Sequence, residues 1–200
     1  HRSLRAAVGW SYSRLETGHQ ALFRRLAVFA GGFPLEAAEA VCADLPVDVL
    51  DGVASLVDKS LLQREEHPDG VLRFRMLEAL REFALEQLAA SGELHRAWHA
   101  HAEFYCALVE RAEPVLTGPE QARGLDELER EYPNIRIVLD RARAGQVDAA
   151  FLPRITAGLW RYWNVRGHWA EGRTWTAAAL PLVQSEPAVL RLRVVHGSSV

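Results

Sequence analysis

The chain has 200 residues, of which 49% are hydrophobic and 24% charged, and its formal net charge is −3 at pH 7. This composition is typical of a packed globular chain with one large domain or two small ones. The weak negative charge argues against a chain-wide nucleic-acid surface, which needs a strong positive excess. We find no apolar run long enough to cross a bilayer and no secretory signal pattern, so we expect a cytoplasmic protein.

The first part of the chain has apolar residues at helical spacing. They predict one helix over residues 4–15 and a second helix that ends at Gly31-Gly32. Arg24 and Arg25 fall away from the apolar stripe of the second helix, so we expect both to face outward. A short third helix should start near Pro34, which suits a first helical turn.

A fourth helix should begin at Asp48, and the pattern then changes to a period of two. Residues 61–66 and 71–76 are candidate strands, separated by His67-Pro68-Asp69-Gly70, whose Asp-Gly pair is a strong hairpin signal. In the second strand the apolar residues Leu72, Phe74 and Met76 alternate with Val71 and two arginines. A further helix should follow and end at Ser91-Gly92. Helices, a two-stranded hairpin and another helix are the plan of a winged helix.

From Glu93 onward the sequence has no strand signal. Long helical stripes are separated by short turns that contain Gly118, Gly145 or Gly167. We expect one helix to open at Gly118-Pro119 and another at Pro133. Antiparallel helices joined by short turns indicate a helical repeat array. We therefore predict a mainly α chain, with a winged-helix domain over residues 1–92 and the start of a truncated array over residues 93–200.

The stretch 158–180 resembles a tetratricopeptide unit. If Gly167 is placed at the glycine between the two helices of that unit, Trp163 and Trp169 fall on its large positions and Ala179 on a small one. The resemblance implies that residues 93–200 belong to a tetratricopeptide-like array.

The first 92 residues resemble the winged-helix part of signal-transduction ATPases of the NB-ARC/STAND class, and most closely that of bacterial transcriptional regulators. The resemblance rests on short motifs that occur in the family's order: Trp10-Ser11-Tyr12, Ala21-Leu22-Phe23, Ser60-Leu61-Leu62, Met76-Leu77-Glu78 and Arg81-Glu82-Phe83-Ala84. It implies that the winged helix is a lid on an upstream nucleotide-binding domain. ATP or ADP is then a ligand of the parent protein, with no cofactor in this segment.

In that family, a Met-His-Asp motif begins the helix after the hairpin and approaches the nucleotide. The matching residues are Met76, Leu77 and Glu78, which the resemblance therefore places near the nucleotide. Leu77 stands where the family has histidine, and leucine cannot donate a hydrogen bond to phosphate.

The sequence offers no catalytic or metal-binding constellation, so we predict that the segment is not an enzyme. Lys59-Ser60 lacks the glycines of a phosphate-binding loop. His95 and His99 have a spacing that can hold zinc, but the second ligand set is missing, and packed or solvated histidines are the better interpretation. Cys42 and Cys106 lie in apolar helical patterns and should be buried free thiols.

Winged helices often bind DNA through the helix before the wing, which here spans residues 48–60. This helix carries three aspartates and one lysine, a net charge of −2, so like charges would meet DNA phosphate. The wing arginines Arg64, Arg73 and Arg75 keep a second interpretation open, a DNA-binding winged helix with a helical dimerisation or effector domain. We therefore expect protein partners, with DNA binding through this segment less favoured.

The second half is also dense in tryptophan and arginine. Dense tryptophans usually pack between helices, but an aromatic patch can also bind a peptide or small effector, and nearby arginines would favour an anionic one. The candidate residues for such a groove are Trp160, Trp163, Arg166, Trp169 and Arg173. We expect the array to act as a sensor through a protein or small effector.

Overall fold

The computed structural model describes residues 2–66 and 70–183. It divides into two compact units, the first up to His101 and the second from Ala102 onward. The boundary falls inside α6 (Leu94–Val115), a continuous helix that begins in one unit and ends in the other. The domain limits expected at residues 92 and 93 stay a prediction.

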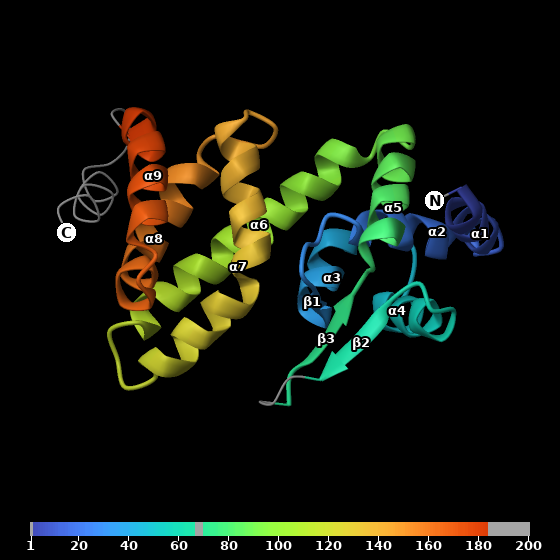
Figure 1. Cartoon of the computed structure of the whole chain (residues 1–200), viewed down its shortest axis with the longest axis horizontal. Helices are drawn as coiled ribbons and strands as arrows, with labels where there is room; N and C mark the ends of the chain where they lie inside the picture. Colours follow the sequence, from blue (N-terminus) through green and yellow to red (C-terminus); the bar gives the residue numbers. More distant parts are fainter. Residues whose placement is uncertain (1, 67–69, 184–200) are drawn as a thin grey trace. The chain divides into compact units, whose positions relative to one another are not determined.

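The first unit contains five helices and three short strands among its described residues, ahead of α6 (Figure 1). In chain order they are α1 (Arg2–Ser13), α2 (Thr17–Leu26), β1 (Phe33–Pro34), α3 (Leu35–Cys42), α4 (Val49–Asp58), β2 (Gln63–Glu66), β3 (Leu72–Arg75) and α5 (Glu78–Ala90). The start of α4 is fixed by Asp48, whose side chain accepts a hydrogen bond of 2.9 Å from the backbone nitrogen of Asp51. This confirms the helix start predicted at Asp48.

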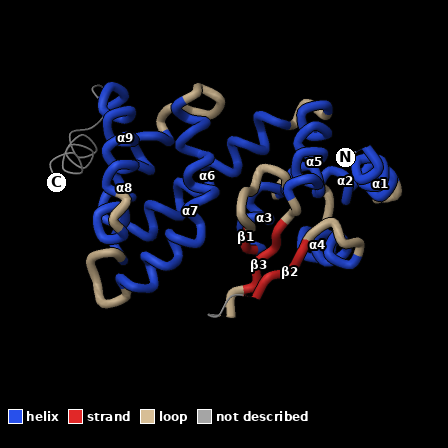
Figure 2. Tube along the Cα trace, viewed as in Figure 1, coloured by secondary structure: helices blue, strands red, loops and turns tan. Residues whose placement is uncertain are grey.

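The strands form one antiparallel sheet in the order β1-β3-β2 (Figure 2). Phe74 in the central strand pairs with Phe33 on one side and with Arg64 on the other. The expected hairpin is present, although its turn at residues 67–69 lies outside the described part of the chain. The expectation of two strands was wrong by one, because a two-residue strand that ends in proline has no alternating pattern to detect.

The burial pattern of β3 also differs from simple alternation. Leu72 is 37% exposed, whereas Arg73 is only 2% exposed. Gly32, at a φ of +103°, makes room beside β3: a Cβ atom there would lie 3.2 Å from the carbonyl oxygen of Phe74 and 3.8 Å from Nε of Arg73. The backbone at Gly32, just before β1, thus lies against the arginine side chain that simple alternation places on the exposed face.

Aromatic residues pack together along the sheet of the first unit. The rings of Phe29 and Phe33 stack with centroids 4.4 Å apart, and Phe33 lies 6.1 Å from Phe74. Leu22 and Leu56 are fully buried on α2 and α4. These buried leucines of α2 and α4 belong to the core that supports the sheet.

The second unit consists of helices throughout its described residues, as the missing strand signal predicted (Figure 2). After α6 come α7 (Gln121–Arg143), α8 (Phe151–Arg166), α9 (Trp169–Ala179) and the 3-10 turn η1 (Leu180–Val183). Gly167 ends α8 in the left-handed region, at φ 79°. In the second unit, as in the first, no described helix is long and apolar enough to cross a membrane.

The expected break at Pro133 is absent, and α7 continues through this residue. A proline removes one helical hydrogen bond, at a cost of about 3 kcal/mol. Leu128 and Ile135 are fully buried on either side of the exposed proline. Burial of this continuous face outweighs the lost bond, which is why local propensity mispredicted a helix start here.

Candidate functional site

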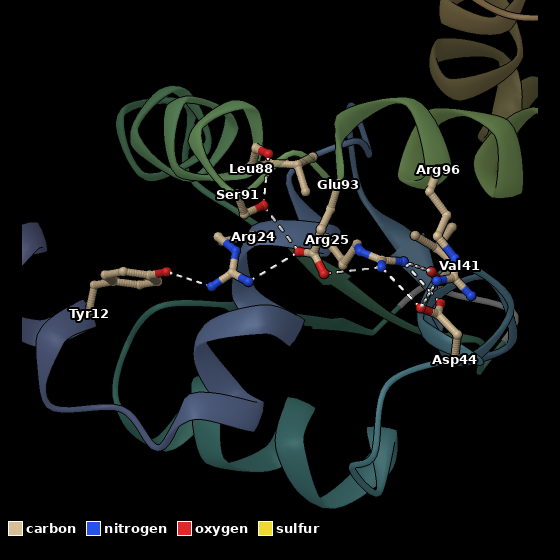
Figure 3. A network of polar contacts seen from close by, with 9 residues as sticks. All are labelled: Tyr12, Arg24, Arg25, Val41, Asp44, Leu88, Ser91, Glu93 and Arg96. Carbon is tan, nitrogen blue, oxygen red and sulfur yellow. Dashed lines mark hydrogen bonds and ion pairs between the residues drawn. The ribbon is translucent and has the colours of Figure 1, made fainter.

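A buried guanidinium lies at the centre of a charged network in the first unit. Arg25 is 1% exposed and bonds both carboxylate oxygens of Asp44, each at 3.1 Å. It also donates to Glu93 at 3.3 Å and to the backbone carbonyl of Val41 at 3.2 Å (Figure 3). The prediction that Arg25 faces outward was wrong, because acidic groups from two distant segments converge on this position.

The neighbouring Arg24 extends the same network and is largely covered as well. Its guanidinium donates to the Tyr12 hydroxyl at 2.9 Å and to the Glu93 carboxylate at 3.1 Å. Ser91 donates to that carboxylate at 3.2 Å. As Figure 3 shows, Glu93 lies between the two arginines and joins α1 and α2 to the turn between α5 and α6.

The network shifts the ionisation of its acids. Burial alone would raise the pKa of Glu93, but hydrogen bonds from Arg24 and Arg25 outweigh it and hold this pKa below its ordinary value. Burial likewise opposes ionisation of Asp44, and the hydrogen bond from Arg25 again lowers the pKa of the carboxyl. Both carboxylates therefore stay charged near neutral pH, and the network is a structural ionic cluster.

The surface of α4, where a winged helix usually meets DNA, is acidic. Its exposed side chains include Asp48, Asp51 and Asp58, whereas the exposed Lys59 bonds Ser55 at 2.6 Å. Three carboxylates against one ammonium would repel the DNA backbone. Leu50 is also 53% exposed on this helix, so the surface combines acidic and apolar groups.

The arginines of the wing do not reverse this balance. Arg64 pairs with Glu66 at 2.6 Å and Arg75 pairs with Glu65 at 3.2 Å, whereas Arg73 is buried. Each exposed wing arginine therefore has a carboxylate beside it. The wing offers little net positive charge to a phosphate chain.

The order of the elements, with the sheet order β1-β3-β2 and a hairpin after α4, is that of a winged helix. Comparison with known families agrees, because residues 15–89 match the winged helix-turn-helix domain. Residues 15–89 are a winged helix-turn-helix domain. Within this domain α4 holds the position from which helix-turn-helix proteins read DNA, so its acidic surface bears directly on function.

Other proteins are similar to most of the chain and not to this domain alone. The chain is 38% identical over 179 residues to a proposed HTH-type transcriptional regulator of Mycobacterium tuberculosis and equally to one of Mycobacterium bovis. These alignments cover 87% of this chain and 20% of each relative, so the chain spans about a fifth of their length. An uncharacterised M. tuberculosis protein is 42% identical over 96 residues, 46% of this chain and 24% of that protein. No solved structure matches the chain.

The residues that the family resemblance places near a nucleotide lie at the start of α5. Met76 is buried, Leu77 is 43% exposed and precedes the helix as its N-cap, and the exposed Glu78 pairs with Arg81 at 3.0 Å. Arg81 also donates to the carbonyl oxygen of Phe29 at 2.8 Å. Of this triplet, Leu77 and Glu78 are accessible to a partner domain, and their predicted role stays a prediction.

The candidate groove residues of the second unit differ in accessibility. Trp163 is 2% exposed, donates from Nε1 to the Tyr132 hydroxyl at 2.7 Å and packs on Gly172, so it belongs to the helix packing. Trp169 is 60% exposed and Arg173 is also exposed.

The other two candidates are Arg166 and Trp160. Arg166 makes ion pairs with Asp126 and Glu129 of α7. Trp160 is half-buried and lines a pocket that includes none of the other four candidates. Of the five candidates, only Trp160 lines this pocket, and the groove stays a prediction.

Both cysteines are free and buried, as predicted. Burial raises the pKa of the Cys42 thiol and of the Cys106 thiol to about 12. Neither thiol is a reactive nucleophile, because the thiolate is scarce at neutral pH.

Proposed function

We propose that this chain is a regulatory segment of a transcriptional regulator and that its winged helix-turn-helix domain contacts protein instead of DNA phosphate. The relatives named as transcriptional regulators support the first part of the proposal. The acidic surface of α4, with Asp48, Asp51 and Asp58 exposed, carries the second part. An acidic surface with an exposed leucine suits a basic or amphipathic protein surface better than a nucleic acid.

The proposed protein contact is a nucleotide-binding domain of the NB-ARC/STAND class, upstream in the parent protein, with ATP or ADP as its ligand. The resemblance of residues 1–92 to the lids of such proteins supports it, as does the exposed Leu77 at the position of the family's phosphate-proximal motif. In this proposal the helical array is tetratricopeptide-like and binds an effector. Effector binding shifts the equilibrium between the docked and undocked positions of the lid.

DNA binding is the second candidate. The comparisons support it more directly than they support an ATPase segment, because the matched domain and the relatives' names both refer to helix-turn-helix proteins. The exposed Arg64 and Arg75 on the wing are its physical basis. In this candidate the helical array serves for dimerisation or effector binding.

Charge substitutions on α4 distinguish the two candidates. Asp51→Asn with Asp58→Asn removes two negative charges from α4, whereas Glu82→Gln with Glu86→Gln, on α5, removes the same number elsewhere. If the domain contacts protein, neither pair changes the weak binding of the chain to duplex DNA by more than about threefold at fixed salt. A site-specific gain or loss of tenfold or more, about 1.4 kcal/mol, for the α4 pair alone would place DNA at α4 and contradict the proposal.

Leu77 tests the lid in the parent protein. Leu77→Asp should change ADP affinity at least about fivefold if this residue faces the nucleotide-binding domain, a coupling of roughly 1 kcal/mol. Ala79→Asp is the control, because Ala79 is also exposed in the first turn of α5. Equal ADP affinities of the two variants would contradict the lid.

A further inference from the structure

Helix α6 contributes to both units. Its residues 94–101 lie in the first unit and residues 102–115 in the second, and the helix is continuous across this boundary. Isolated helices shorter than about 12–15 residues are marginal in water. The first segment, of about two turns, therefore depends on contacts with the first unit and on the helix that continues beyond it.

A line of aromatic rings holds the first segment of α6 in the first unit. His101 is fully buried, with its ring 5.2 Å from Phe29 and 5.5 Å from Trp98. Phe29 stacks on Phe33, and the ring of Phe33 lies 6.1 Å from Phe74 in the central strand β3. The last residue of the segment is thereby connected through packed side chains to the middle of the sheet.

Ionic contacts attach the other end of the same segment. Arg96, in the first turn of α6, pairs with Asp44 at 3.1 Å. Glu93, which directly precedes the helix, accepts from Arg24 and from the buried Arg25, and Arg25 also bonds Asp44. Unfolding of this segment would leave a buried guanidinium with fewer charged partners, which is costly.

The second segment of α6 is equally part of the core of the second unit. Tyr105 is fully buried and donates to Glu131 of α7 at 3.0 Å. Val109 is also fully buried and faces Gly158 of α8, where an added Cβ atom would lie only 2.5 Å from its Cγ1. The second segment cannot unfold without loss of these contacts to α7 and α8.

We propose that α6 is a coupling helix, through which the folded array stabilises the winged helix-turn-helix domain and the domain stabilises the array. In an α-helix each N–H donates to the carbonyl group four residues earlier, so residues 102–105 donate to residues 98–101 across the boundary. Loss of structure in one unit removes these donors or acceptors from the other. By reciprocity, whatever stabilises one unit stabilises the other. This inference goes beyond the proposed function and does not depend on it, since it holds whether the winged helix meets protein or DNA.

Fluorine NMR in urea tests the coupling in the 200-residue chain labelled with 4-fluorophenylalanine. Phe74 in β3 and Phe151 in α8 are both buried and report on the two units separately. Gly158→Ala should lower the urea midpoint of the Phe151 signal by about 0.5 M or more, and Leu159→Ala, which leaves a cavity in the same helix, is a second such change. We expect the Phe74 midpoint to fall by the same amount, within about 0.2 M. An unchanged Phe74 midpoint beside a lowered Phe151 midpoint would overturn the proposal.

Variants at the boundary show whether the coupling passes through α6. Glu103 is exposed, and Glu103→Pro removes one helical hydrogen bond across the boundary, whereas Glu103→Ala removes the same charge and keeps the helix. With Glu103→Pro, Gly158→Ala should lower the Phe151 midpoint only, and with Glu103→Ala it should lower both midpoints. Equal shifts of Phe74 in the two backgrounds would contradict a coupling helix. If Glu103→Pro fails to fold, Glu93→Gln carries the test from the first unit, because it should lower the Phe151 midpoint as much as that of Phe74; a shift of Phe74 alone would overturn the proposal.

Discussion

Glu93 accepts a hydrogen bond of 3.3 Å from the guanidinium of Arg25, although 68 residues separate the two positions in the chain. The contact joins the core helix α2 to the start of α6, which continues into the second unit. Its partner Arg25 is buried, and Arg24 bonds the same carboxylate. These hydrogen bonds hold the winged helix-turn-helix domain to the residue that directly precedes α6.

Removal of the Glu93 charge should destabilise the first unit. In Glu93→Gln, the buried guanidinium of Arg25 keeps Asp44 but loses one of its two charged partners, at an expected cost of about 2 kcal/mol. Urea unfolding followed by circular dichroism measures the change. Glu82→Gln, at an exposed position on α5, is the control and should stay within about 0.5 kcal/mol of wild type. Equal midpoints for the two variants would show that the Glu93 charge contributes no stability.

The same carboxylates predict a dependence of stability on acid. The pKa values of Glu93 and Asp44 are lowered from 4.5 and 3.8, so the folded state binds protons less readily than the unfolded state. Their contribution to stability is complete above the ordinary values and is lost as the pH falls through the lowered ones. Melting temperatures from about pH 6 to pH 3 should fall less steeply for Glu93→Gln than for wild type. Parallel curves would contradict this assignment.

Helix and sheet elements of the first unit follow from local sequence signals. The aspartate cap of α4 and the Asp-Gly hairpin signal are both short-range features, and the structure has α4 and the two paired strands where they predict them. The ionic network was not predicted, because Arg25, Asp44 and Glu93 share no spacing and meet only when the chain folds. One sequence signal could have found it: Arg24 and Arg25 lie between apolar residues, Leu22-Phe23 before them and Leu26-Ala27-Val28 after them.

The second unit shows where local rules fail. Pro133 predicted a helix start, yet tertiary burial carries α7 through it. The tryptophans predicted as a groove separate into the buried Trp163 and the exposed Trp169, because periodicity identifies an apolar face without showing which neighbour covers it. The pocket beside Trp160 depends on the approach of α8 to the end of α6, which no sequence spacing encodes.

Gly158 on α8 packs closely against α6, so a methyl group added there should lower the free energy of unfolding. A Cβ atom at Gly158 would lie 2.5 Å from Cγ1 of Val109. Gly158→Ala should therefore destabilise the second unit by about 1–3 kcal/mol, although alanine favours helices by about 1 kcal/mol over glycine. Addition of Val109→Ala should restore part of the loss, in a double-mutant cycle measured by urea unfolding. Strictly additive effects would show that the two side chains do not compete for space.

The two cysteines should resist modification in the folded chain. Their thiols are buried with pKa values of about 12, so Ellman's reagent at about pH 8 should react with them only on unfolding. Absorbance at the start of the reaction, with and without denaturant, provides the measurement. Rapid reaction of a native thiol would mean that Cys42 or Cys106 is accessible.

The salt dependence of DNA binding tests the central claim most directly. Fluorescence anisotropy of the 200-residue chain with labelled duplex DNA, between about 50 and 200 mM salt, gives the slope of log affinity against log salt. An acidic α4 and a charge-balanced wing predict weak binding with a slope that corresponds to at most about two phosphate contacts. A slope that corresponds to six or more phosphate contacts means a loss of roughly 10³ in DNA affinity over this salt range. That result would show a cationic DNA interface and contradict a protein-contacting winged helix.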